Sequence, residues 1–384
     1  MTRQTYTLEL ITPCFCAGAD PAQAEIRAPS IRGQLRWWFR VLGGFKSLAP
    51  MSVRDQEAMI FGQTAGDEGS AGKLMVRISS PQPRSERKNA DDLGAGTNTP
   101  LGYALFPLRP FGDSDGKRGV LSEGTQFKLD LLWRGASKLQ EDIHSLVTVW
   151  SHLGAIGFRS RRSFGAIRCM QPTEMLSEAL NRFSAPKSVS VVRVNQSINN
   201  WREAAAESLK WYRSWRQHGQ MNRRWDRRSS SWITISPAQQ AENRSHPGFR
   251  YSRRDHNEGL AVQGTGAPSP DPEAPHGLAG QTFRPALGLP IIQFFSSLGG
   301  PNGPISRSRA TVNWNETADG GRFASPVLLR PHKDAQGKWH ALVIFVDAHA
   351  WPAGKQVFLN GHPRDVSPDL YNAMKADKRL TPFP

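Results

Sequence analysis

The chain has 384 residues, 38% of them hydrophobic, so it is long enough for more than one packed domain and too apolar to be disordered throughout. Lysine and arginine exceed aspartate and glutamate by 16, and a strongly basic protein usually binds a polyanion, most commonly a nucleic acid. No run approaches the ~18 consecutive apolar residues of a membrane span, and 3 cysteines cannot form a disulfide framework. These features predict a cytoplasmic protein that makes no contact with a membrane.

The first block of the chain, residues 1–171, alternates between strand and helix patterns. Alternating apolar residues predict strands over residues 5–11, 73–79, 103–108, 126–133 and 166–169. Apolar residues at helical spacing predict helices over residues 31–42, 53–60 and 143–153. Polar, turn-rich loops are expected over residues 82–100 and 112–119. This order is that of a ferredoxin-like domain, an antiparallel sheet with helices on one face, which RNA-recognition domains also use.

Within the middle block, residues 172–280, one stretch accounts for most of the excess of basic over acidic residues. Residues 182–254 hold 15 basic and only 4 acidic side chains. Most of the basic residues are arginine, whose planar group suits bidentate phosphate contacts and stacking on bases. A strand is expected over 189–194, a helix over 201–216, and a Pro- and Gly-rich linker or loop over 256–280. The plainer alternative for this charge is a solvated basic face.

The third block, residues 281–384, completes the predicted fold. Its expected strands cover residues 291–295, 325–330 and 339–346. They indicate a second, shorter ferredoxin-like unit. The predicted fold class is therefore α+β, with two ferredoxin-like (RRM-like) units over residues 1–171 and 281–384 and a basic, partly helical insertion over residues 172–280.

The sharpest local pattern is the glycine-rich segment, residues 154–168. Its glycines, Gly157 among them, bracket the polar residues Arg159, Ser160, Arg161, Arg162 and Arg168. Glycine lets the backbone approach a ligand closely, and the surrounding cations suit a sugar–phosphate backbone. The segment is not a nucleotide P-loop, because the Gly-Lys-Ser/Thr ending is missing. The alternative is a basic turn that merely joins a helix to a strand.

The start of the helix expected over residues 31–42 is a second candidate site. Ser30 would cap this helix, with Arg32 and Gly33 in its first turn. Backbone N–H groups and the helix dipole attract anions at such a terminus. Arg36 follows at a spacing of four residues from Arg32 and extends the same basic stripe.

Other candidate residues carry weaker patterns. Arg307 and Arg309 would give the third block a basic loop of its own. His152 comes just before the glycine-rich segment, where it is a candidate general base, although a histidine at a helix end is more often structural. Cys14 and Cys16 have no histidine at zinc-ligand spacing, so we expect buried thiols, no metal and no cofactor.

Several segments resemble the RAMP superfamily of CRISPR-associated proteins. Residues 11–20 and 25–40 are similar to the opening of the first RAMP subunit of the Cmr effector, a type III-B CRISPR complex. Residues 57–62 resemble the next element of that family, and the glycine-rich segment resembles a loop found across the superfamily. Residues 287–290 and 322–326 look like its C-terminal half. The resemblance is dense in the first block, patchy in the third and absent from the middle one.

This resemblance implies a non-catalytic subunit, built from two ferredoxin-like units, at one end of an RNA-guided complex. Such a subunit contacts the 3′ region of the guide RNA, the target RNA paired with it, and other effector subunits, in antiviral defence. By position, the RNA-contacting residues would be Ser30, Arg32, Gly33, Arg36, Gly157, Arg159, Arg161 and Arg162. Ser163 stands where the family often has a glycine, so the loop geometry would differ there if the position needs a positive φ.

Two other functions compete with this one. An endoribonuclease that processes guide RNA or cuts target RNA would use His152, or Asp20, because some relatives in the superfamily cut RNA with a loop aspartate. It predicts cleavage by the isolated chain. A protein–protein scaffold would instead dock an acidic subunit on the arginine-rich middle block, at Arg223, Arg224, Arg227 and Arg228.

Overall fold

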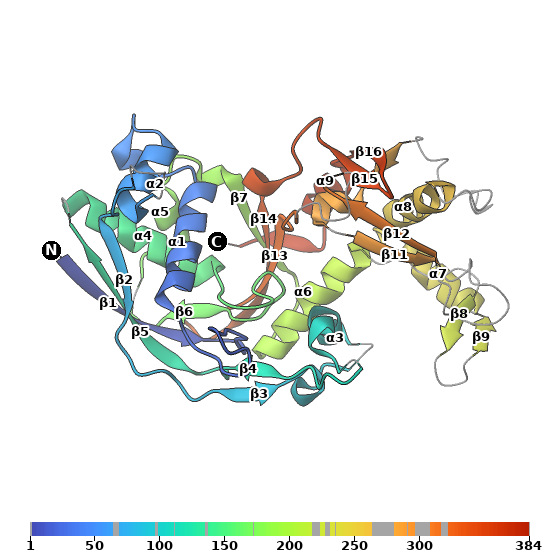
Figure 1. Ribbon diagram of the computed structural model, residues 1–384, viewed down its shortest axis with the longest axis horizontal. Helices are drawn as coiled ribbons and strands as arrows, with labels where there is room; N and C mark the ends of the chain where they lie inside the picture. The colour runs from blue at the N-terminus through green and yellow to red at the C-terminus, as the bar shows by residue number, and fades with distance from the viewer. Residues whose placement is uncertain are drawn as a thin grey trace. The chain divides into compact units, whose positions relative to one another are not determined.

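The computed structural model describes residues 2–63, 69–96, 99–110, 112–134, 137–171, 173–216, 223–226, 231–234, 236–262, 280–289, 291–295, 308–315 and 322–383. The chain divides into two compact units (Figure 1). Unit 1 comprises Met1–Leu209, Val327–Ala348 and Arg379–Pro384, and unit 2 comprises Lys210–Pro326 and His349–Lys378. No helix among the described residues is long and apolar enough to cross a membrane.

Unit 1 begins with an antiparallel sheet in the strand order β2-β5-β1-β6. The strands are β1 (Thr2–Leu10), β2 (Leu74–Ile78), β5 (Gln126–Trp133) and β6 (Ile167–Cys169). Helix α1 (Ala28–Val41) follows β1, and helix α4 (Ser137–Leu153) follows β5. This element order and strand order are those of a ferredoxin-like fold, as predicted from the sequence.

The core of this sheet is built from the apolar stripes of α1 and α4. The helices bury Ile31, Leu35, Trp38 and Phe39 of α1 together with Ile143, Val147 and Trp150 of α4. Burying each large apolar side chain contributes about 1.5–3 kcal/mol, so these two helices are held firmly against their surroundings. Helix α2 (Val53–Phe61) packs beside α1 and is capped by Ser52, whose hydroxyl accepts from the Asp55 N–H at 3.2 Å.

Unit 1 also contains a second antiparallel sheet, in the order β13-β14-β7-β17. Its strands are β7 (Val189–Val194), β13 (Val327–Lys333), β14 (Trp339–Val346) and β17 (Leu380–Pro382). Helix α6 (Trp201–Arg216) follows β7 in the chain and α9 (Asp369–Lys375) precedes β17, so the ferredoxin-like element order occurs twice. Because β7 lies in the predicted insertion, this sheet draws strands from both sides of residue 280. The division into three domains remains a prediction.

Shorter elements complete unit 1. They are β3 (Glu86–Lys88), β4 (Arg118–Val120), α3 (Pro100–Ala104), α5 (Leu176–Leu180) and the 3₁₀ turns Lys46–Leu48, Asp91–Leu93, Phe106–Leu108 and Pro186–Ser188. The predicted strand over 103–108 was wrong. Thr99 caps α3 by accepting from the Gly102 N–H at 3.0 Å, and Pro100 fits the first helical turn, so the local signal favours a helix.

Unit 2 contains a sheet in the order β10-β16-β15-β12-β11 and a separate hairpin of β8 and β9. The strands are β8 (Arg223–Asp226), β9 (Ser231–Thr234), β10 (Gln281–Thr282), β11 (Ile291–Phe295), β12 (Ser308–Asn313), β15 (Gln356–Leu359) and β16 (His362–Val366). The helices of unit 2 are α7 (Pro237–Ser245), α8 (Phe249–Val262), α9 and residues 210–216 of α6, together with the 3₁₀ turn Arg284–Leu287. Residues 256–262 of the predicted linker therefore belong to α8. Asp255 of this helix is buried and accepts from Thr282, Phe283 and Arg284.

Candidate nucleic-acid interface

The glycine-rich segment lies along α1. It leaves the end of α4 and enters β6, and two hollows are lined by residues of both the segment and α1. We call this region the α1–loop surface, and its residues that line the hollows include Arg27, Ser30, Gly33, Trp37, Arg40, Gly157, Phe158, Ser160 and Arg161. The two candidate sites predicted from the sequence therefore lie side by side.

Left-handed backbone conformations shape the segment. Gly157 has a φ of +81°, and a Cβ there would lie 2.5 Å from the carbonyl oxygen of Phe15. The next N–H, that of Phe158, donates to the same carbonyl at 2.7 Å, which ties the segment to the loop after β1. Ser163 also has a positive φ, +75°, so this position does need the conformation that glycine favours, and the serine adopts it.

A buried arginine that the sequence analysis missed holds both ends of the segment. Arg330 of β13 is 1% exposed, and its guanidinium donates to the carbonyl oxygens of Gly154 at 2.8 Å and Ser151 at 2.7 Å, and also to that of Ile167. The carbonyls at the end of α4 carry the negative end of the helix dipole, which favours a cation there. Burial lowers the pKa of Arg330 to about 9, so the group stays charged at neutral pH.

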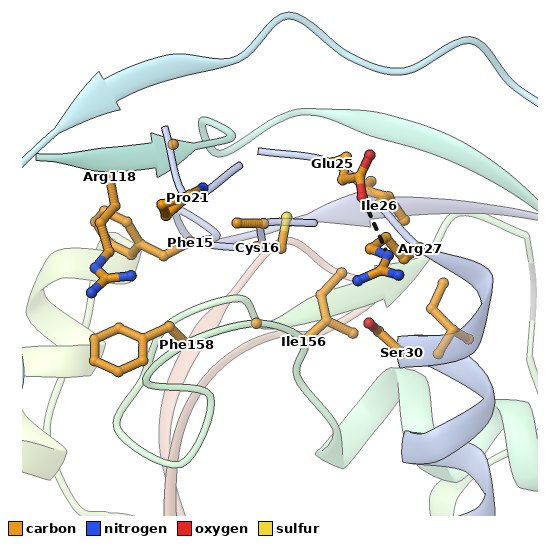
Figure 2. A pocket seen from close by; sticks show the side chains of 14 residues that line it. Phe15, Cys16, Pro21, Glu25, Ile26, Arg27, Ser30, Arg118, Ile156 and Phe158 are labelled. Carbon is orange, nitrogen blue, oxygen red and sulfur yellow. Dashed lines mark ion pairs between the residues drawn. The ribbon is translucent and has the colours of Figure 1, made fainter. Parts of the chain in front are cut away.

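The first hollow has a volume of about 350 Å³ and ends at an exposed aromatic ring (Figure 2). Phe158 is 41% exposed, with the guanidinium groups of Arg118 and Arg159 each 5.8 Å from its ring centroid. At the other end of the hollow, Arg27 forms an ion pair with Glu25 at 3.2 Å. The hollow thus combines a partly exposed aromatic ring with cationic groups.

The second hollow, of about 180 Å³, lies further along α1. There the Arg161 guanidinium lies 5.4 Å from the ring centroid of Trp37. Burial, and secondarily the neighbouring Arg162, lower the pKa of Arg161. Gly33 is exposed on the same helix, and a Cβ at this position would meet no atom within 4 Å. A ligand backbone therefore has open access to this side of α1.

The N-terminus of α1 differs from the prediction. The helix begins at Ala28 with Arg27 as its N-cap residue, so the prediction that Ser30 caps it was wrong. Pro29 fits the first turn because its φ is fixed and its missing N–H would have no partner there. The Ser30 N–H donates to the Arg27 carbonyl at 3.1 Å. Fewer N–H groups are thus open to an anion than predicted, and Ser30 instead lines the first hollow.

The basic stripe of α1 contacts α2. Arg36 pairs with Glu57 of α2, and Arg40 reaches the same carboxylate at 3.3 Å. Arg32 donates to the carbonyl oxygen of Phe61 at the end of α2. These guanidinium groups tie the two helices together, and a role for Arg32 or Arg36 in binding RNA remains a prediction.

Other predicted arginines lie apart from the exposed part of the α1–loop surface. Arg162 is buried and donates to the Val327 carbonyl at 2.9 Å, while Arg168 of β6 forms an ion pair with Glu9 of β1 at 2.7 Å. Arg309 lies on β12, where only its backbone is described, and Arg307 lies outside the described residues. None of these observations tests whether the residues contact RNA.

His152 lies at a third hollow of unit 1, of about 540 Å³. Its ring stacks on that of His332, with the centroids 5.2 Å apart, and its Nε2 lies 3.4 Å from the Thr173 hydroxyl. Burial and the charge of Arg330 lower the pKa of His152 to about 4. A base with so low a pKa accepts a proton poorly at neutral pH, which argues against general-base catalysis by this residue.

The remaining catalytic and metal candidates are Asp20 and the three cysteines. Asp20 is exposed in the loop after β1 and accepts from the Ala22 N–H at 2.8 Å. Cys14 is buried as predicted, whereas Cys16 and Cys169 are half-buried, and all three thiols are free. Across the part of the chain that the structure describes, no group of three or more His, Cys, Asp or Glu side chains could hold a metal ion.

Comparison with known proteins identifies the family. A RAMP superfamily model matches residues 7–168. The chain is 40% identical over 195 residues to the CRISPR system Cmr subunit Cmr1-2 of Pyrococcus furiosus, and this match covers 46% of the chain and 100% of that protein. The chain belongs to the Cmr1 family of the RAMP superfamily.

A second Cmr1 protein matches over a shorter share of its length. The CRISPR system Cmr subunit Cmr1-1 of Pyrococcus furiosus is 30% identical over 185 residues, which are 46% of this chain and 47% of that protein. The match thus spans about half of this relative. The crystal structure of apo Cmr1 from Pyrococcus furiosus aligns with 99% of this chain and 98% of its own, with a TM-score of 0.51 and 16% identity. This structural likeness supports the RAMP fold with ferredoxin-like units.

Sequence patterns missed three important residues of this Cmr1-family surface. Arg330 appeared only as the end of an expected strand, and Arg118 as part of an expected loop. Phe158 lies inside the glycine-rich segment, whose charged residues gave the predicted pattern. A signal was available for Phe158, because an aromatic residue between two polar stretches of a loop has no core to fill. Arg330 and Arg118 gave no such signal, since their roles depend on contacts made in the folded chain.

Proposed function

We propose that the chain is a non-catalytic RNA-binding subunit of a type III-B CRISPR effector complex in the cytoplasm. In this role it contacts the 3′ region of the guide RNA and the target RNA paired with it, beside other effector subunits, in antiviral defence. The similarity to Cmr subunits supports membership of such a complex. The α1–loop surface supports the binding of RNA.

One observation carries this proposal: the glycine-rich segment and α1 together line two hollows that have arginines at them. Arg159 and Arg161 are both half-buried; Arg161 lines the second hollow together with the open helix position Gly33, and Arg159 lies at the Phe158 ring. Glycine in a helix interior costs about 0.5–1 kcal/mol relative to alanine, so an exposed one with nothing near it suits the close approach of a ligand backbone. Cations beside such an opening are what a phosphate chain requires.

The non-catalytic part of the proposal rests on the surroundings of the candidate bases. His152 has a strongly lowered pKa and lies against Arg330 and His332. Asp20 lies in an exposed loop, with a backbone N–H as its hydrogen-bond partner. Neither residue is part of a described acid–base pair, which in-line RNA cleavage without a metal would need.

Salt-dependent binding tests the proposal. Affinity for a short single-stranded RNA is expected to fall steeply with salt, and Arg159→Ala with Arg161→Ala is expected to weaken it. Each phosphate contact contributes about −0.7 to the slope of log K against log salt, so the double variant should have a slope that is shallower by about 1.4. Fluorescence anisotropy at several salt concentrations gives both quantities.

A matched control removes the same charge elsewhere in unit 1. Arg54 of α2 and Arg77 of β2 are exposed, and replacing both with alanine should leave the slope close to that of the unchanged chain. Equal slopes for all three proteins would contradict the proposed surface. The same reactions, run with and without Mg²⁺, are read for cleavage, and cut RNA that disappears in an Asp20→Ala variant would establish the endoribonuclease instead.

A further inference from the structure

We propose that the first hollow of the α1–loop surface holds one unpaired nucleobase of a bound RNA, which stacks on the ring of Phe158. This inference rests on the proposed function, since it concerns how the same surface takes hold of the RNA. It assigns a base-binding role to Phe158 and Arg118, neither of which belongs to the basic pattern of the sequence.

The shape and lining of the hollow suit a flat, partly apolar group. Its volume of about 350 Å³ lies within the range of about 300–1,000 Å³ that is typical of small-ligand sites. Three isoleucines, Ile26, Ile31 and Ile156, line it and are all buried. Phe158 projects at one end, as Figure 2 shows, and is 41% exposed although the chain buries most of its phenylalanines.

The charges around Phe158 select an anion that carries a ring. Arg118 and Arg159 lie at equal distances of 5.8 Å from the ring centroid. Arg118 is exposed and has no acidic partner within ion-pair distance among the described residues. A nucleotide presents a π-face to the phenylalanine and a phosphate to the arginine, which is how proteins bind single strands. An apolar peptide would use the hollow but would offer no anionic group to Arg118.

The backbone that carries the Phe158 ring is held in place, which lowers the entropic cost of ordering this loop when a base stacks. Phe15 and Phe158 form an isolated antiparallel bridge, and the Phe158 N–H donates to the Phe15 carbonyl at 2.7 Å. Gly157 makes this close pairing possible, because any larger residue would collide with Phe15. The ring is therefore presented on a rigid support, although it comes from a loop.

Cys16 provides a reporter inside the hollow. It lines the first hollow and is half-buried, and the Cys14 thiol hydrogen-bonded to it lowers its pKa, which favours the reactive thiolate. Burial raises the pKa of Cys169, which is also half-buried but lines a different hollow. Alkylation by iodoacetamide should therefore modify Cys16 faster than Cys169. A base in the first hollow should slow the reaction at Cys16 alone.

The test combines affinity with this reporter. Phe158→Ala should weaken binding of single-stranded RNA by between about fivefold and a hundredfold without changing the salt slope, because stacking is lost and phosphate contacts are kept. Phe158→Trp should restore binding. Phe106→Ala is the control, since Phe106 is 61% exposed and does not line the hollow. Bound RNA should slow alkylation of Cys16, whereas an abasic oligomer of the same length should not.

The outcomes distinguish failure of the base site from failure of the proposed RNA-binding function. Salt-steep binding that Phe158→Ala leaves unchanged, with Cys16 equally reactive in free and bound protein, would overturn the base site and leave the proposed function standing. If the protein without any substitution binds no RNA at low salt, the proposed function itself is wrong. Nucleoside monophosphates and RNA are compared at the same nucleotide concentration. If the monophosphates protect Cys16 as well as the RNA does, the hollow binds a free nucleotide instead.

Discussion

Replacing Arg330 with methionine is expected to lower the free energy of unfolding by about 3–5 kcal/mol, because buried carbonyl groups lose the donor that satisfies them. Its guanidinium donates to backbone oxygens of Ser151, Gly154, Ile167 and Pro331. A methionine fills similar volume but offers no N–H group. The loss should appear in urea unfolding as a lower midpoint with a similar slope.

Arg330→Met should also weaken RNA binding at the α1–loop surface. Arg330 holds both the start and the end of the glycine-rich segment, so its loss should weaken RNA binding even where the protein remains folded. Arg330→Lys keeps the charge but loses the planar group of donors. Its stability and RNA affinity should therefore lie between those of the original chain and those of Arg330→Met. Arg54→Met removes an exposed arginine of unit 1 and should alter neither property. If Arg330→Met unfolds at the same urea concentration as the unchanged chain, this account of the anchor is wrong.

Acid is expected to destabilise unit 1 between about pH 6.5 and pH 4. The folded-state pKa of His152 is about 4, against 6.5 for an ordinary histidine, because of burial first and the charge of Arg330 second. In this window the unfolded chain binds a proton that the folded protein does not, so stability falls as the pH falls. Each unit of pKa shift corresponds to about 1.4 kcal/mol, which gives about 3 kcal/mol at pH 4 for this one residue.

His332 adds to the effect in the same direction. Burial, and then the charge of Arg330, lower its pKa well below the usual value, and its ring stacks on that of His152. Urea unfolding at pH 7, 6, 5 and 4 measures the combined loss. A His152→Gln variant should show a shallower dependence on pH. A stability that is constant or rises over this range would show that the histidines are not held neutral inside the fold.

The sequence predicted helices and strands well where the buried residues are the apolar ones at helical or alternating spacing. The bounds of β5, β7, α6 and β14 agree with the prediction, because each has a strong apolar alternation or helical stripe. The first ferredoxin-like unit follows from the order of the strands and helices predicted over residues 1–171. The predicted strand over 103–108 failed because the capping residue Thr99 and Pro100 outweighed the apolar residues that follow them.

The candidate interface was predictable in part. The glycine-rich segment and the start of α1 were both recognised, and the fold places them along one surface. The spacing of the arginines did not predict which of them remain exposed. Arg36 of α1 is spaced along the sequence like a surface arginine, but it forms an ion pair with Glu57 of α2. Arg330 is 163 or more residues from the carbonyl groups to which it donates at the two ends of the segment, so only the folded chain reveals this contact.

The most direct test of the central claim is to crosslink RNA to the chain and map the attachment sites. A single-stranded RNA carrying 4-thiouridine at successive positions would be bound at low salt, irradiated, digested and analysed by mass spectrometry. The account predicts crosslinked peptides from residues 27–37 and 154–161, the two sides of the α1–loop surface. Crosslinks confined to the arginine-rich residues 182–254 would contradict it and place the RNA on the middle block.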